Sequence, residues 1–300
     1  MNNSKLRRKR MTTWGAIVVL STVLSACTSS SAPDSIEHMH GLAFSKDGKE
    51  VWIPAHEGIV VYRDGKWSNA PGKKHDYMGF SSTNDGFYSS GHPARGSDLP
   101  NPLGLIKSTD DGKTIETLAL SGEVDFHGLT AGYRSHTLYV FNSSPNTLMP
   151  TPGFFSSTDE AETWKQSDFK GVTGQPVAFA AHPDHAGTVS VATDQGLFQS
   201  KDFGNTFENI TFDPRIAAIN YAPNGELLVS TLDGKLMMQS EEGWTDILLS
   251  NKRPEEIITY MAQNPIDSKE WVVATEQLNL WISRDQGGTW APLASQGKLK

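Results

Sequence analysis

The sequence predicts an all-β protein built from repeated units, and two observations support this prediction. The first is a recurring pattern, S-x-D-x-G-x-T-W, whose variants occupy residues 108–115 (STDDGKTI), 157–164 (STDEAETW), 200–207 (SKDFGNTF) and 283–290 (SRDQGGTW). The second is the spacing of these segments. Together with weaker echoes at Asp64 and Glu242, their acidic residues lie between 40 and 49 residues apart. A regular period in the forties indicates an array of similar supersecondary units.

Each unit has the pattern of a small antiparallel sheet. In the fourth unit, residues 176–181 (PVAFAA), 188–193 (TVSVAT) and 196–200 (GLFQS) form three short runs rich in Val, Ala, Phe and Thr. The repeated segment then makes a turn, and residues 207–210 begin a fourth run. Short β-branched and aromatic runs separated by Gly, Asp, Asn and Pro are typical of antiparallel hairpins. We therefore expect four strands in each unit, with the repeated turn between the third and the fourth.

Six such units predict a β-propeller of six four-stranded blades around a central channel. The first strands should begin near His40, Asp76, His127, Gln175, Ala217 and Thr259. In the repeated turns, glycine can take the positive φ of a tight turn, and Ser and Asp side chains can bond nearby backbone N–H groups. The residues expected to build these turns are Ser108, Asp110, Gly112, Ser157, Asp159, Trp164, Ser200, Asp202, Gly204, Ser283, Asp285, Gly287 and Trp290.

The repeated segments resemble the BNR or Asp-box repeats of sialidases, sortilin-like proteins and a photosystem II assembly factor family. The wider pattern HxHGLAF, SGHP, PNPLG and DFHGL resembles a group of bacterial lipoproteins labelled as glycosyl hydrolases. The repeat resemblance covers residues from about 39 to 295 and implies a propeller fold. It implies little about function, because Asp boxes form turns in enzymes and non-enzymes alike.

The N-terminus has the pattern of an export signal. Five basic residues between positions 5 and 10 precede an apolar segment, residues 14–24, which is too short for a membrane-spanning helix. The sequence Leu-Ser-Ala before Cys27 resembles the bacterial lipobox, and that resemblance implies cleavage before Cys27 and a lipid on its thiol. We therefore expect a signal peptide over 1–26, a lipidated Cys27 with a flexible tether over 27–37, and one propeller domain over 38–300.

The charge balance limits the classes of partner. The whole chain carries a net charge of −8, and removing the predicted signal leaves 21 basic and 34 acidic residues, a net charge of −13. An acidic surface argues against a nucleic-acid partner. We expect an extracytoplasmic monomer anchored to the cell membrane, whose partner is a small ligand, a metal ion or another extracytoplasmic protein.

Polar side chains gather on one predicted face of the wheel, where first strands begin and second strands end. The sequences His40-Gly-Leu and His127-Gly-Leu mark equivalent places in blades one and three, and Asp76 takes that place in blade two. A long loop, residues 91–104, should overhang the same face and carries Asn101. The candidate metal or ligand residues are His38, His40, His56, Asp76, His92 and His127.

Imidazole and carboxylate groups are common ligands of transition metals, so the leading hypothesis is a metal-binding propeller. Copper and zinc are the candidate ions, and Met39 and Met78 nearby would favour copper because thioether is a soft ligand. The corresponding first-strand positions in blades four to six offer no comparable set of ligands.

Two alternatives use the same face. One is a glycoside hydrolase-like enzyme in which Asp76, Asp125 and Glu57 supply an acid and a base. A sialidase mechanism lacks support because the Arg-Ile-Pro signature of that family is missing and, of the arginines that could grip a substrate carboxylate, Arg215 alone is a candidate for a first-strand position at the channel. The second alternative is a non-catalytic scaffold that binds a protein partner during assembly.

Overall fold

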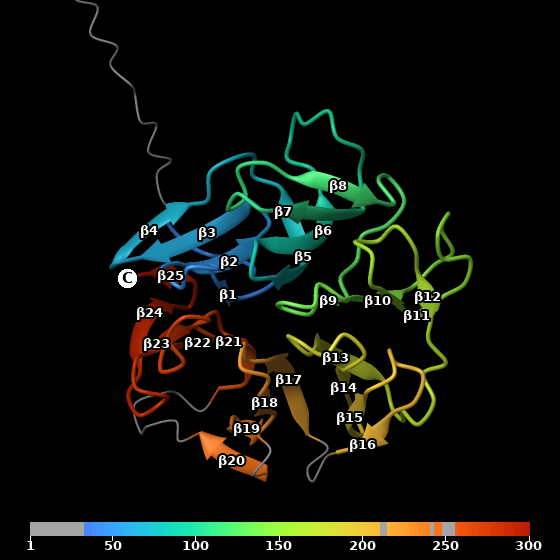
Figure 1. Cartoon of the computed structure of the whole chain (residues 1–300). Helices are drawn as coiled ribbons and strands as arrows, with labels where there is room; N and C mark the ends of the chain where they lie inside the picture. The colour runs from blue at the N-terminus through green and yellow to red at the C-terminus, as the bar shows by residue number, and fades with distance from the viewer. Residues whose placement is uncertain (1–32, 211–214, 241–242, 248–255) are drawn as a thin grey trace, which may run out of the picture.

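The computed structural model describes residues 33–210, 215–240, 243–247 and 256–300, and its strands form six antiparallel sheets. Figure 1 shows these sheets arranged around a central axis in chain order, from blue to red. Within the described ranges all regular elements are strands, and none of these residues forms a helix suited to crossing a membrane. The predicted all-β propeller with six blades is confirmed.

We number the blades one to six in chain order. Blades one to three consist of β1 (Ala43–Phe44), β2 (Val51–Ala55), β3 (Gly58–Arg63) and β4 (Lys66–Asn69); β5 (Asp76–Ser82), β6 (Phe87–His92), β7 (Leu105–Ser108) and β8 (Glu116–Ala119); and β9 (Leu129–Ala131), β10 (Leu138–Asn142), β11 (Gly153–Ser157) and β12 (Lys165–Gln166). Blades four to six consist of β13 (Pro176–Ala181), β14 (Val189–Thr193), β15 (Gly196–Ser200) and β16 (Glu208–Asn209); β17 (Ile216–Tyr221), β18 (Leu227–Thr231), β19 (Leu236–Ser240) and β20 (Gly243–Ile247); and β21 (Ile258–Gln263), β22 (Trp271–Thr275), β23 (Leu280–Ser283), β24 (Ala291–Ser295) and β25 (Lys298–Leu299).

The first strand of each blade is the innermost one. β1, β5, β9, β13, β17 and β21 contact one another in that order, and β21 contacts β1, so the inner strands form a closed ring. The central channel inside this ring contains a cavity of about 380 Å³. The starts of the inner strands therefore surround one end of the channel, as the sequence predicts.

The core consists of six apolar clusters, one between each pair of neighbouring blades. Successive residues of a strand point to opposite faces of its sheet. Trp52 of β2 accordingly packs towards blade two, whereas Ile53 packs towards blade six. Alternation along each strand thus joins every blade to both of its neighbours, and burial of these faces supplies the main driving force for folding.

The ring closes where the two ends of the described chain meet. Blade six has a fifth strand, β25, which the sequence analysis did not predict. Ser35 forms an antiparallel bridge with Lys298, and the Ile36 N–H donates to the Gly297 carbonyl over 2.8 Å. Ile36 is buried in the cluster between blades one and six. The propeller therefore includes Ser35 and Ile36, which the sequence analysis assigns to the tether, whereas residues 1–26 and Cys27 lie outside the described residues.

The four repeated turns share one hydrogen-bond pattern and connect the third strand of a blade to the fourth, as predicted. In the turn after β15, Ser200 Oγ donates to Asp202 Oδ1 over 2.7 Å, and the same oxygen accepts the Thr206 N–H over 2.9 Å. Ser200 Oγ in turn accepts the Gly204 N–H over 2.9 Å. The turns that begin at Ser108, Ser157 and Ser283 make the same three contacts. We call these four segments the S-x-D turns.

Two consecutive residues in each S-x-D turn have a positive φ. The fifth position is Gly112, Gly204 or Gly287, as predicted, but Ala161 holds it in blade three with a φ of 70°. The fourth position also has a positive φ, and it holds Asp111, Glu160, Phe203 or Gln286. Four different side chains thus accept the left-handed conformation, which costs non-glycine residues free energy. The repeated side-chain hydrogen bonds maintain this conformation.

Candidate functional site

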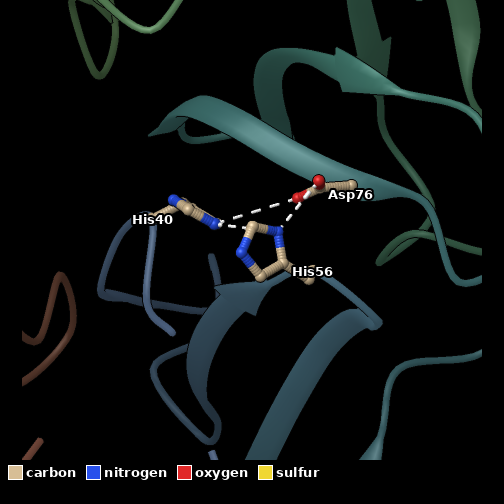
Figure 2. A group of neighbouring side chains, drawn as sticks. All are labelled: His40, His56 and Asp76. Carbon is tan, nitrogen blue, oxygen red and sulfur yellow. Dashed lines mark hydrogen bonds and ion pairs between the residues drawn. The ribbon is translucent and has the colours of Figure 1, made fainter. Parts of the chain in front are cut away.

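The strand order of blades one and two brings two histidines and a carboxylate together at the channel mouth. His40 lies just before β1, His56 directly follows β2, and Asp76 begins β5. Because β1 and β2 are antiparallel, the start of one and the end of the other lie at the same end of the blade. Asp76 joins them from the neighbouring blade. Figure 2 shows the three side chains pointing toward one another.

The ligand atoms of these side chains converge on one point. His40 Nε2 lies 3.4 Å from His56 Nδ1 and 3.8 Å from Asp76 Oδ1, and His56 Nδ1 lies 2.9 Å from Asp76 Oδ2. One ligand atom from each residue lies within 4.8 Å of the other two. We call His40, His56 and Asp76 the first triad.

Hydrogen bonds within the first triad do not satisfy its carboxylate. Asp76 Oδ1 is buried and has no hydrogen-bond partner, although the side chain keeps a fifth of its surface exposed. The one proton that His56 Nδ1 can carry serves Oδ2 in the short contact. An unpaired buried carboxylate oxygen is costly, so this atom is suited to a cation.

The protonation of His40 also suits a metal ligand. Burial lowers the pKa of His40, and the nearby His56 lowers it further, while Asp76 acts in the opposite direction. The imidazole is therefore neutral at pH 7, which leaves one ring nitrogen with a lone pair to donate. A neutral imidazole is the form that binds zinc or copper.

The spacing of the first triad fits a small transition-metal ion. Two ligand atoms that each lie about 2.0 to 2.2 Å from a tetrahedral zinc ion are separated by about 3.3 Å. The two imidazole nitrogens of the triad are 3.4 Å apart, which is close to this value, and each lies within 3.8 Å of one oxygen of Asp76, His40 near Oδ1 and His56 near Oδ2. The donor set and the geometry thus both fit such an ion.

His38, another predicted ligand, lies at the edge of the first triad. Its ring packs edge-on against His56, with the ring centroids 4.9 Å apart. His38 is exposed, so its side chain can approach a bound ion from the solvent side.

A second group forms around Asp125, which precedes β9. His127 Nε2 lies 2.9 Å from Asp125 Oδ2, and His92 Nε2 lies 3.3 Å from the same oxygen. His92 Nδ1 donates to Asn101 Oδ1 over 2.7 Å, so the long loop 91–104 contributes to this group as predicted. We call His92, Asp125 and His127 the second triad.

Other candidate residues have different surroundings. Glu57 is exposed and borders a separate small pocket with Lys73 and Lys74, although it adjoins His56 in the sequence. Met39 is buried in the cluster between blades one and six, and Met78 is buried as well. Both methionine side chains thus contribute to the apolar core, and the choice between copper and zinc stays a prediction.

His75, which the sequence also places on this side of the wheel, is a buried structural residue. Its Nδ1 accepts the backbone N–H of Ala94 over 3.0 Å, so it anchors the start of the long loop. Burial lowers the pKa of His75, and Lys73 lowers it further. A neutral His75 holds the loop that carries Asn101.

Comparisons with known proteins establish the fold. No protein-family model matches the chain, and no curated protein matches it significantly. Among solved structures, the chain is similar to a GH74 enzyme of Niastella koreensis, with a TM-score of 0.57, 16% identity, and coverage of 88% of this chain and 46% of that one. It is also similar to YCF48 bound to D1 peptide, with a TM-score of 0.50, 16% identity, and coverage of 87% and 82%.

A gluconolactonase from Xanthomonas campestris has a TM-score of 0.58 and 10% identity, with coverage of 83% of this chain and 86% of that one. At these identities the similarity concerns the propeller fold alone. The chain also spans only about half the length of the GH74 enzyme. The function must therefore be argued from the side chains at the channel mouth.

Proposed function

We propose that this protein is a membrane-anchored, extracytoplasmic propeller that binds a transition-metal ion at its channel mouth. The observation that carries the proposal is the first triad, in which two imidazole nitrogens and a carboxylate converge around a buried oxygen without a donor. An ion at this point would bond to His40, His56 and Asp76, and it would take the place of the missing donor at Asp76 Oδ1.

Zinc is the ion that we consider first. Imidazole nitrogen and carboxylate oxygen are usual zinc ligands, and the set lacks the thioether that would favour Cu(I). Cu(II) accepts the same donors, so it is the main competitor. Three protein ligands leave one position of a tetrahedral ion open, either for His38 or for a small ligand that enters from the channel.

The location is proposed from the sequence. The basic and apolar N-terminal segments and the lipobox-like residues before Cys27 support export and attachment to a membrane. Since Ile36, near the start of the described residues, packs at the junction of blades one and six, an anchored chain would hold blade one, with the first triad, close to its tether.

The test is the metal content of the full-length chain, purified in detergent without a histidine tag and dialysed against Zn²⁺. We expect bound zinc in the wild-type chain and the loss of one equivalent in His40→Ala. His185→Ala, which removes an exposed histidine at the opposite end of the channel, is the matched control and should keep the metal. A wild-type chain that binds neither zinc nor copper at micromolar concentration would overturn the proposal.

A further inference from the structure

The second triad lies one blade further along the chain than the first triad and shares one contact with it, although its second histidine comes from blade three. His56 directly follows the second strand of blade one, and His92 ends the second strand of blade two. Asp76 begins the first strand of blade two, and Asp125 lies shortly before the first strand of blade three. In both places a histidine from one blade thus meets a carboxylate from the next.

We propose that the second triad is a second metal subsite, so that the channel mouth holds two ions. The proposal rests on the metal binding proposed above and extends it to His92, Asp125 and His127. It gives Asp125 the role of a ligand, and Asn101 that of a positioning residue.

Asn101 determines which nitrogen of His92 is free. Since Asn101 Oδ1 can only accept, the 2.7 Å contact requires that His92 Nδ1 carry a proton. In neutral His92 the other nitrogen, Nε2, then has a lone pair, and this atom lies 3.3 Å from Asp125 Oδ2. A lone pair facing a carboxylate is unfavourable unless a cation or an added proton lies between them. Metal-bound histidines commonly have such a hydrogen bond from their second nitrogen.

The carboxylate of Asp125 has the same defect as that of Asp76. Asp125 Oδ1 is buried without a hydrogen-bond partner, and the side chain is only 16% exposed. A second proton on His92 or His127 would serve Oδ2, which both rings approach, but it would leave Oδ1 unpaired. A metal ion can bind either oxygen or both, so it would supply the partner that Asp125 Oδ1 lacks once the two imidazoles turn toward it, whereas in the described residues the first triad alone already holds its three ligand atoms within 4.8 Å of one another.

The two subsites open into one space. His40 and His127 both line the channel cavity. Two divalent ions in neighbouring subsites repel one another. We therefore expect the second ion to bind more weakly than the first.

The experiment is a zinc titration of the full-length chain in detergent, followed by equilibrium dialysis and elemental analysis. The wild-type chain should bind two equivalents in two steps. Asp125→Asn and Asp76→Asn should each bind one equivalent, and the double variant none. The control His185→Gln should bind two. Asn101→Leu should weaken only one of the two steps, by about 10- to 100-fold, because it removes an outer hydrogen bond of a ligand.

The outcomes separate this inference from the proposed function. One equivalent that is lost in Asp76→Asn and kept in Asp125→Asn would overturn the second subsite and leave the first intact. One equivalent lost in both variants would show a single shared ion and would also overturn the inference. No metal in the wild-type chain would overturn the proposed function itself. If Asp125→Asn fails to fold, His127→Gln at an exposed position is the substitute, and it should weaken or abolish the second step.

Discussion

Removing one aspartate from an S-x-D turn should destabilise the propeller without affecting its channel mouth. In blade four, Asp202 accepts three hydrogen bonds: from Ser200 Oγ, from the Thr206 N–H and from Thr206 Oγ1. The last two are 2.9 and 2.6 Å long. Asp202→Ala removes all three at once. It also removes the groups that keep the turn in its left-handed conformation.

The size of the effect follows from this geometry. A hydrogen bond contributes a net of about 0.5 to 1.5 kcal/mol, and water can replace part of the loss at this partly exposed turn. We expect Asp202→Ala to lower the free energy of unfolding by about 2 kcal/mol, and Tm by about 4 °C in a protein of this size. Asp202→Asn keeps one acceptor for the Thr206 N–H, so it should cost less.

The acid dependence provides a second readout. The side-chain hydrogen bond from Thr206 is the main cause that lowers the pKa of Asp202, followed by the backbone bond from the same residue. A carboxyl with a lowered pKa in the folded state stabilises the protein above its ordinary pKa of about 3.9, and this contribution is lost as the pH falls through the lowered value. The difference between wild type and Asp202→Ala should therefore shrink below about pH 4.

The assay is urea unfolding at pH 7 and at lower pH, with zinc binding measured on the same samples. Glu208→Ala is the matched control, because it removes an exposed carboxylate from the same blade without touching the turn. The reasoning is refuted if Asp202→Ala unfolds like Glu208→Ala, or if it loses zinc while still folded.

One further pair of substitutions tests the S-x-D turns, and a single substitution tests a histidine at the opposite end of the channel. An added Cβ would lie 2.9 Å from the buried Phe154 ring in Gly204→Ala but no closer than 3.6 Å to any atom in Gly112→Ala. Each variant should be less stable by about 1 kcal/mol, because its alanine must adopt a left-handed conformation. Thermal melts should show a larger decrease in Tm for Gly204→Ala, because of the close contact with Phe154. Burial, followed by the charge of His185, lowers the pKa of His182 to about 4. The neutral imidazole therefore favours the folded state fully above about pH 6.5, and this stabilisation is lost as the pH falls from about 6.5 to about 4. His182→Asn should flatten the pH dependence of urea unfolding in this range, and an unchanged profile would contradict it.

The sequence predicts most of the fold because the repeat provides local signals. Each strand has an apolar face, and each S-x-D turn combines a carboxylate with residues that accept a positive φ. The fifth strand of blade six was missed because Lys298–Leu299 is too short to show a pattern, and because its pairing depends on a turn with positive φ at Gln296 and Gly297. The contact between Ser35 and Lys298 joins distant parts of the chain, and neither residue has a local signal for it.

The candidate site is predictable where the repeat fixes equivalent positions. The shared sequence His-Gly-Leu correctly places His40 and His127 at the channel. Glu57 lies at a different pocket from its neighbour His56, because both residues lie in the turn where the chain reverses between β2 and β3. The contact between His92 and Asp125 depends on how the end of β6 in blade two meets the segment that leads into β9 of blade three, and neither residue alone signals it.

The fold itself does not require the polar residues at the channel mouth. Ala217 and Thr259 lie at the equivalent positions of blades five and six, line the same cavity and leave the ring closed. The histidines and carboxylates in blades one to three thus lower the stability of the fold, because two buried carboxylate oxygens have no hydrogen-bond donor. Each such oxygen costs about 1 to 3 kcal/mol when it is left unpaired.

This cost leads to a prediction about stability that separates a binding role from a structural one. If the carboxylates are held ready for metal, the double variant Asp76→Asn, Asp125→Asn should be at least as stable as the wild type when both are free of metal. Added zinc should then raise the Tm of the wild type and leave that of the variant unchanged, because a ligand stabilises only the state that binds it. Thermal melts with chelator and with zinc measure both effects. A metal-free variant that is less stable than the wild type by more than about 1 kcal/mol would show that the histidine–carboxylate contacts serve the fold, since that loss is the usual value of a hydrogen bond.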